Sequence, residues 1–297
     1  MILITGAGGK TGKAVAQALV ARGEPVRALV HRDQQAAELT ALGARQVSVG
    51  DLRDGEALSQ AANGANAIYH IAPNVSPIEV PIGQAVMAAA IKSGIRRLVF
   101  HSVLHPQLGD MPHHWDKLRV EEMLLSADLD VTILQPTAYM QNILAGWDRM
   151  TQHGVYRVPY PTSTRLSLVD LEDVAEAAAL VITSSRHAGA TYELVGTSPL
   201  DQGQVAEILG EALGRRVRAE SQSVEEWDSH ARRSGMGDYQ RETLLKMFRC
   251  YARNGLVGNP NVLGWLLDRT PTNLLAFALR TAGAEPTILP AAAASAP

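Results

Sequence analysis

The sequence has little of several features that mark particular classes of protein. It contains one cysteine, Cys250, which excludes an internal disulfide and a cysteine-rich metal site. Basic residues are not in excess, and the net charge of −3 argues against a global nucleic-acid-binding surface. No apolar run approaches the roughly 18 residues of a membrane span, and no basic segment of a signal peptide begins the chain. These absences favour a cytoplasmic protein without nucleic-acid or membrane partners.

The most informative stretch is MILITGAGGKTG, residues 1–12. Residues 2–5 resemble a short buried strand, and residues 10–21 have the composition of a helix. A strand that enters a glycine turn and then a helix binds anions, because glycine lets the backbone approach the ligand and the free N–H groups of the first helical turn point at a phosphate. The residues that we expect at such a ligand are Gly6, Gly8, Gly9, Lys10, Thr11 and Gly12.

Gly9-Lys10-Thr11 also resembles the end of a P-loop. That motif needs a glycine five residues before its last one, and Ile4 stands there. The loop is too short to wrap a triphosphate, so a nucleoside triphosphatase is excluded. An ordinary strand–helix turn stays as the simple alternative.

Strand-like and helix-like segments alternate as far as Pro136. Such alternation predicts an α/β fold, a doubly wound parallel sheet of the Rossmann type whose ligands bind at the carboxyl ends of the strands. We expect an NADP-binding Rossmann domain over residues 1–136. The strands are expected at 2–5, 26–30, 46–49, 67–71, 97–101 and 131–134, and the helices at 10–21, 34–42, 55–62, 82–93 and 115–127.

The regular alternation of strands and helices stops beyond residue 136, where helical segments predominate. Residues 139–151, 171–184 and 204–213 and much of 224–277 read as helices, with short strands at 155–158, 191–195 and 216–219. We expect a smaller, mostly helical substrate or cap portion over 137–285, with a strand that can return to the first domain. The alanine-rich residues 286–297 form a low-complexity tail that carries no functional inference.

Arg32 follows the second strand, where NAD-binding folds usually carry an acidic residue for the ribose 2′-OH. An arginine there suits the 2′-phosphate of NADP through a charge-assisted contact, so NADP(H) is the preferred cofactor, although the neighbouring Asp33 complicates the choice. The alternative is a solvated arginine at a helix start.

Two further strand ends offer contacts to a dinucleotide. Asp51 can accept from an adenine amino group while Leu52 packs on the ring; alternatively Asp51 or Asp54 caps the next helix. Ile71, Ala72 and Pro73 end the fourth strand and form a smooth wall for ribose and pyrophosphate.

The segment between the fifth and sixth strands is rich in groups that exchange protons, with histidines at 101, 105, 113 and 114. No carboxylate or cysteine stands at a recognisable metal spacing from them, so no metal is expected. On a helix His113 or His114 shares a face with Lys117, and a lysine beside a nicotinamide ribose can fix the sugar or act as a base. A solvated helix face over 117–122 is the simple alternative.

Together these residues resemble the NmrA-like and isoflavone-reductase-like branch of the atypical short-chain dehydrogenases/reductases. The resemblance implies that NADP(H) binds the N-terminal domain and that a substrate or partner cleft lies against the C-terminal one. The matching pieces are TGAGGKTG, Arg32, GD at 50–51, HSV at 101–103, HWDKLRVEEML from His114, LQPTAYMQN from Leu134, LVDLEDVAEAA from Leu168 and the late YELVG. The resemblance places around the cofactor Gly6, Gly9, Lys10, Thr11, Gly12, Arg32, Asp51, Ala72, Pro73, Lys117 and Pro136.

One departure from the short-chain dehydrogenases concerns the proton donor. Their Tyr-x-x-x-Lys frame is His113-x-x-x-Lys117 here, without the tyrosine. This fits two behaviours of the family: reductases of the isoflavone-reductase type, in which a lysine is the catalytic base, and regulators that need no turnover.

The leading hypothesis is an NADP(H)-dependent reductase of a small carbonyl, quinone or conjugated substrate. Lys117 with His113 would be the acid/base, Ser102 would polarise an oxygen, and Tyr139, reached from the sixth strand, is an alternative donor. The alternatives are a non-catalytic NADP(H)-sensing regulator and an NADP-using lyase or isomerase. The proton-exchanging groups favour an enzyme; the sequence is compatible with a homo-oligomer but does not fix the oligomeric state.

Overall fold

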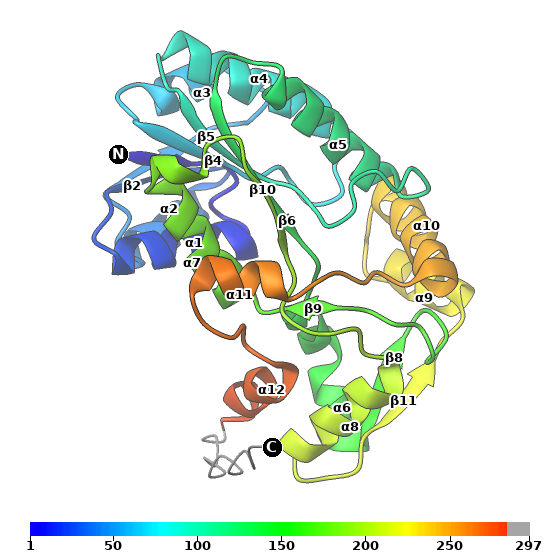
Figure 1. Ribbon diagram of the computed structural model, residues 1–297. Helices are drawn as coiled ribbons and strands as arrows, with labels where there is room; N and C mark the ends of the chain where they lie inside the picture. Colours follow the sequence, from blue (N-terminus) through cyan, green and yellow to red (C-terminus); the bar gives the residue numbers. More distant parts are fainter. Residues whose placement is uncertain (284–297) are drawn as a thin grey trace.

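The computed structural model describes residues 1–283 and is built around one seven-stranded sheet (Figure 1). All neighbouring strands in it are parallel, in the order β10-β6-β5-β4-β1-β2-β3. This confirms the doubly wound α/β fold. The tail expected at 286–297 and the last two residues of the portion expected at 137–285 lie outside the described residues. The strands are β1 (Ile2–Ile4), β2 (Val26–Val30), β3 (Gln46–Val49), β4 (Ala67–His70), β5 (Arg97–His101), β6 (Asp130–Pro136) and β10 (Thr191–Leu194).

Helices cover both faces of the sheet. Because side chains alternate along a strand, neighbouring residues enter different cores: Tyr69 packs on the side of α1 and α7, whereas Ile68 and Phe100 pack on the side of α4 and α5. One face carries α1 (Lys10–Ala21), α2 (Asp33–Ala41) and α7 (Leu171–Ile182), and the other carries α3 (Gly55–Ala62), α4 (Glu79–Lys92) and α5 (Pro112–Leu125).

The chain leaves the sheet after β6 and returns to it at β10, which pairs with β6 through Thr191 and Ile133. Between them, β7 (Ala138–Tyr139) pairs with β9 (Leu168–Val169). The helix predicted over 139–151 is therefore wrong in its first part, because the backbone of Tyr139 is paired with Val169 and a 3-10 helix, η1 (Met140–Gly146), follows. Only α6 (Trp147–His153) is α-helical there.

A third core lies beside the sheet and includes α6, β8 (Val155–Val158) paired with β11 (Arg218–Ser221), α8 (Gln202–Ala212), α10 (Asp238–Asn254) and α12 (Leu274–Ala282). In Figure 1, α6, α8, β8 and β11 are gathered below the sheet. This part also contains the 3-10 helix η2 (Ser185–His187), α9 (Val224–Arg233) and α11 (Asn261–Leu267), and the buried Leu263 and Leu267 of α11 join the core on the side of α1 and α7. Among residues 1–283, no helix is long and apolar enough to cross a membrane.

Candidate functional site

The glycine turn lies at the carboxyl end of β1, against the end of β4. Gly6 has φ +61°, and a Cβ there would lie 2.5 Å from the carbonyl oxygen of Ile71. A Cβ on Gly12 would lie 2.5 Å from the Gly6 oxygen, so both positions require glycine. Gly9 begins α1 without any side chain capping the helix. The first-turn N–H groups of α1 are thus free of a side-chain cap and suit a phosphate.

Arg32 stands at the N-terminus of α2 with an exposed side chain. Gln35 fixes the backbone beside it: its Oε1 accepts from the backbone N–H groups of His31 (3.2 Å) and Arg32 (3.1 Å). The amide of Gln35 reaches the Gly8 oxygen at 3.4 Å, which joins this strand end to the glycine turn. The arrangement leaves the Arg32 guanidinium accessible to a phosphate at the end of β2.

The aspartate after β3 is held by its own loop. The side chain and backbone N–H of Arg53 both donate to Asp51 and lower the pKa of this carboxyl to about 2. Asp54, not Asp51, caps α3, since its carboxylate accepts from the N–H groups of Glu56 (2.9 Å) and Ala57 (3.3 Å). Asp51 therefore keeps its charge at neutral pH at the edge where we expect adenine.

The neighbouring predicted contacts differ in exposure. Leu52 and Ile71 are half-buried, Ala72 is buried and Pro73 is exposed. Pro136 is buried as the last residue of β6, and its carbonyl accepts from Leu104 N–H at 2.9 Å. All follow or end parallel strands, so they lie at the carboxyl edge of the sheet together with the glycine turn.

Lys117 belongs to an ion pair. Its Nζ donates to Glu79 Oε1 at 2.8 Å and approaches the backbone oxygen of His101 at 3.4 Å. The Glu79 side chain is only 2% exposed, so this ion pair lies almost out of reach of solvent on the glutamate side. The ammonium also lies 5.4 Å from the centre of the Phe100 ring, on the α5 side of the sheet. These contacts hold the ammonium at the end of β5.

The two histidines before Lys117 are largely withdrawn from solvent. The ring of His114 is buried and its Nδ1 donates to the His105 oxygen at 3.2 Å. The centres of the His113 and His114 rings lie 4.6 Å apart in an edge-to-face arrangement. The buried Nδ1 of His113 has no hydrogen-bond partner among the described residues. Burial, with the other nearby charges, lowers the pKa of His113 to about 3 and that of His114 to about 4. Both rings are therefore neutral at physiological pH.

Ser102 is turned toward a buried carboxylate. Its hydroxyl donates to Glu121, which also accepts from Gln135 Nε2 at 2.9 Å. Burial raises the pKa of Glu121, and the two hydrogen bonds oppose that rise. Because the Ser102 hydrogen is engaged inside this cluster, the geometry does not favour the serine as a group that polarises substrate.

Tyr139 is the predicted catalytic residue whose side chain lies beside the glycine turn, next to Lys10 and Thr11. Its hydroxyl lies 2.6 Å from Nε2 of His101, whose Nδ1 lies 2.8 Å from the Tyr69 hydroxyl. Lys10 Nζ stands 5.7 Å from the centre of the Tyr139 ring. Burial raises the pKa of Tyr139, and the nearby Thr11 hydroxyl opposes this shift. Tyr139 is therefore a protonated phenol beside the predicted phosphate-binding residues.

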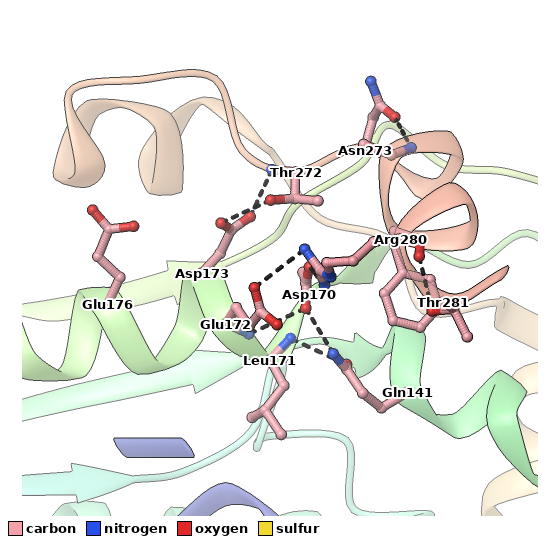
Figure 2. Close-up of polar contacts among 12 residues, drawn as sticks. Gln141, Asp170, Leu171, Glu172, Asp173, Glu176, Thr272, Asn273, Arg280 and Thr281 are labelled. Carbon is pink, nitrogen blue, oxygen red and sulfur yellow. Dashed lines mark hydrogen bonds and ion pairs between the residues drawn. The ribbon is translucent and has the colours of Figure 1, made fainter. Parts of the chain in front are cut away.

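A polar cluster fixes the backbone just after Tyr139 (Figure 2). Gln141 donates to Asp170 Oδ1 at 2.7 Å and accepts from the N–H of Leu171 at 3.1 Å. The guanidinium of Arg280, from α12, donates to the other carboxylate oxygen, Asp170 Oδ2, at 2.5 Å. The N-terminus of α7 thereby holds the segment that carries Tyr139.

Sequence reasoning missed Tyr69 and Glu79, and it counted His101 among the proton-exchanging histidines without giving it a role at Tyr139. A usable signal for Tyr69 and His101 was present: Tyr69 is the next-to-last residue of β4 and His101 the last residue of β5, at the carboxyl ends where ligands bind. Glu79 carries no such signal, because it lies 38 residues from Lys117. In residues 1–283 there is no group of three or more His, Cys, Asp or Glu side chains that could hold a metal ion.

A cavity of about 600 Å³ lies elsewhere, between α11, α12 and the loop after β10. None of the predicted site residues lines it, and the exposed Trp265 stands at its wall. The candidate site is therefore the carboxyl edge of the sheet, not this cavity.

A model of the NmrA-like family matches residues 1–277. The chain belongs to the NmrA-like family. The family resemblance expected from the motifs is thereby confirmed, over the sheet and most of the C-terminal part.

Several named proteins are similar to this chain over most of its length. The chain is 26% identical to an NAD(P)H azoreductase of Xenophilus azovorans over 91% of this chain and 92% of the relative. It is 31% identical to (4-alkanoyl-5-oxo-2,5-dihydrofuran-3-yl)methyl phosphate reductase of Streptomyces griseus, over 76% and 78%. The structure of an Escherichia coli NADPH-dependent quinone oxidoreductase complexed with NADPH matches with a TM-score of 0.83 at 26% identity, covering 95% of this chain and 99% of that chain.

Proposed function

We propose that this NmrA-like protein is an NADP(H)-dependent oxidoreductase that reduces a small quinone, azo or conjugated carbonyl compound. The relatives named for azo, quinone and unsaturated-lactone reduction support the substrate class. The observation that carries the proposal is the Tyr139 hydroxyl, hydrogen-bonded to His101 at 2.6 Å beside the glycine turn. It would supply the donor that the His113-x-x-x-Lys117 frame lacks.

The strand edge fits NADP(H). The uncapped first turn of α1 would hold the pyrophosphate, and the exposed Arg32 would pair with the 2′-phosphate. Asp51 would accept from the adenine amino group. When bound, NADPH supplies a hydride to the substrate. The structure of the E. coli relative with NADPH bound supports this assignment.

Tyr139 would donate the proton that reduction of a carbonyl or azo group requires. Its raised pKa keeps the hydrogen in place before reaction. The Lys10 ammonium, 5.7 Å from the ring, would stabilise the phenolate that remains. Lys117, paired with Glu79, would fix the nearby strand end and the cofactor ribose without exchanging a proton.

The test is steady-state NADPH oxidation over a panel of quinones, enones, aldehydes and azo dyes. Tyr139→Phe should lower kcat on its best substrate by about 100-fold or more, as expected for loss of a general acid, with NADPH affinity unchanged. Tyr156→Phe is the matched control, because its hydroxyl binds Gln202 in the C-terminal part.

Two results would contradict this proposal. Full activity of Tyr139→Phe would assign the proton to another group. Absence of turnover across the panel, together with different affinities for NADP and NADPH, would support the regulatory alternative instead.

A further inference from the structure

We propose that His101 is a positioning residue whose Nε2–H is aimed at the Tyr139 hydroxyl, in a tautomer that Tyr69 selects. This inference rests on the proposed function in one respect, that Tyr139 is the proton donor. Each hydroxyl and ring nitrogen that links Tyr69, His101 and Tyr139 donates or accepts a hydrogen bond, and the surroundings of Tyr69 determine which.

The three hydrogen-bonded side chains of Tyr69, His101 and Tyr139 extend from the core of the sheet to the glycine turn. Tyr69 is fully buried on β4, and His101 is 6% exposed at the end of β5. The two hydrogen bonds measure 2.8 Å from Tyr69 Oη to Nδ1 and 2.6 Å from Nε2 to Tyr139 Oη. Each ring nitrogen of His101 therefore has one tyrosine hydroxyl as its partner.

The His101 ring is neutral, so one nitrogen donates and the other accepts. Burial first, then the charges of Lys117 and His70, lower the pKa of His101 to about 3. The remaining question is which tautomer the two tyrosines select.

The position of Tyr69 decides the tautomer. Within residues 1–283, the hydroxyl of this fully buried tyrosine has His101 as its hydrogen-bond partner and no other. If Nδ1 carried the hydrogen, the hydroxyl hydrogen of Tyr69 would be left without an acceptor, which is costly for a buried group. Tyr69 therefore donates to Nδ1, and Nε2 carries the hydrogen.

The consequence falls on Tyr139. Because Nε2–H donates to Tyr139 Oη, the hydroxyl hydrogen of Tyr139 must point away from His101. During reduction this hydrogen leaves Oη for the substrate oxygen or nitrogen, and the phenolate left behind keeps the Nε2–H bond. His101 neither gains nor loses a proton, and Tyr139 recovers its hydrogen from solvent. A hydrogen bond to the charged form of an acid favours that form, so His101 assists the transfer.

The first test is structural and needs no substrate. Nitrogen-15 NMR of histidine-labelled protein distinguishes a bare ring nitrogen from a protonated one, and the His101→Gln variant identifies which signals belong to His101. The expected result is a bare Nδ1 and a protonated Nε2. The opposite assignment, or a charged ring at neutral pH, overturns the inference whether or not the protein is an enzyme.

The second test is kinetic. A glutamine at 101 offers an amide oxygen for Tyr69 and an N–H for Tyr139, whereas leucine offers neither. His101→Leu should lower kcat by about 10- to 100-fold, in line with loss of one hydrogen bond to a charged group, and leave the KM for NADPH unchanged. His101→Gln should recover most of that loss.

The Tyr139→Phe background separates positioning from general damage. There the His101→Leu change should cause no further loss of kcat, because its effect passes through the Tyr139 hydroxyl. An equal loss in both backgrounds, or unchanged kcat in His101→Leu, would refute the role of His101. Absence of turnover in the wild-type protein would refute the proposed function, while the NMR result still decides the tautomer.

Discussion

Two groups meet at the end of β5, on opposite sides of the sheet. On the α5 side, Lys117 approaches the His101 carbonyl and is paired with the buried Glu79. On the α1 side, the His101 ring links two tyrosines and carries no charge. On the lysine side, the positive charge of Lys117 and the negative charge of Glu79 form an ion pair. On the tyrosine side, the inferred tautomer of His101 directs the hydroxyl hydrogen of Tyr139 away from His101, where it can be donated to a ligand.

Lys117 is the conspicuous residue in the sequence, yet its ammonium is held in place by Glu79. In the proposed function the neutral Tyr139, and not the charged Lys117, gives up the proton. The comparison predicts that damage to the lysine side lowers stability, and damage to the tyrosine side lowers turnover.

The largest effect is expected from Lys117→Met, which leaves Glu79 charged and buried. Loss of one partner of such a pair should lower the free energy of unfolding by about 3 kcal/mol or more, measured by urea denaturation. The double variant Glu79→Gln/Lys117→Met should recover much of it. If the folded single variant instead loses about 100-fold or more in kcat with NADPH still bound, the comparison is broken and Lys117 is the acid/base.

A medium effect is expected from Arg32→Ala, which lies on neither side of β5. Loss of a charge-assisted contact to the 2′-phosphate should weaken NADPH binding by about tenfold or more, with little change for NADH. Calorimetry with both cofactors measures this, and Arg22→Ala, exposed at the far end of α1, is the control. Equal weakening of NADPH and NADH binding would remove the assignment of Arg32 to the 2′-phosphate. Weaker binding of NADPH alone, with an unchanged free energy of unfolding, would separate cofactor binding from the stability effect expected on the lysine side.

The smallest effect concerns pH. His101 has a pKa of about 3 in the folded protein against 6.5 unfolded, so the unfolded chain takes up the proton first as the pH falls. Its contribution to stability is thus present above pH 6.5 and is lost progressively between pH 6.5 and 3. His101→Gln should make the free energy of unfolding fall less from pH 7 to 5, by about 1–2 kcal/mol.

The exposed His153 provides the matched control for that measurement, as His153→Gln. Three other largely buried histidines, His70, His113 and His114, have lowered pKa values too, so some loss on acidification remains in every variant. If the free energy of unfolding of His101→Gln falls with pH in parallel with that of the wild-type protein, His101 is charged in the folded state. The inference that a neutral His101 links the two tyrosines would then be wrong.

The sequence was sufficient for the parts that rest on local order. Alternating strands and helices predicted the parallel sheet, and the glycine spacing predicted the turn at which Gly6 and Gly12 allow close backbone approach. The start of α3 followed from a cap by Asp51 or Asp54, of which the structure has Asp54. These features depend on residues within a few positions of one another.

The reactive geometry depends on residues far apart in the chain. Tyr69, His101 and Tyr139 are 32 and 38 residues apart and meet because β4 and β5 are adjacent and β7 pairs with β9. Period-two alternation predicts that Tyr69 and His70 face opposite sides, but not which groups stand opposite them. Lys117 was predicted near the cofactor, yet its pairing with Glu79 required the packing of α4 against α5.

The place of β10 has a consequence for synthesis of the chain. This strand pairs with β6 only after an excursion from Ala138 to Ala190, and the N–H of Ile133 bonds to the carbonyl of Ala190. As a ribosome releases the polypeptide, β6 is therefore an unprotected sheet edge until Leu194 has emerged. The pairing of Thr191 with Ile133 joins residues far apart in the chain, and contacts of this kind form slowly in general. A chain interrupted before that residue would expose the strand that leads directly to Tyr139.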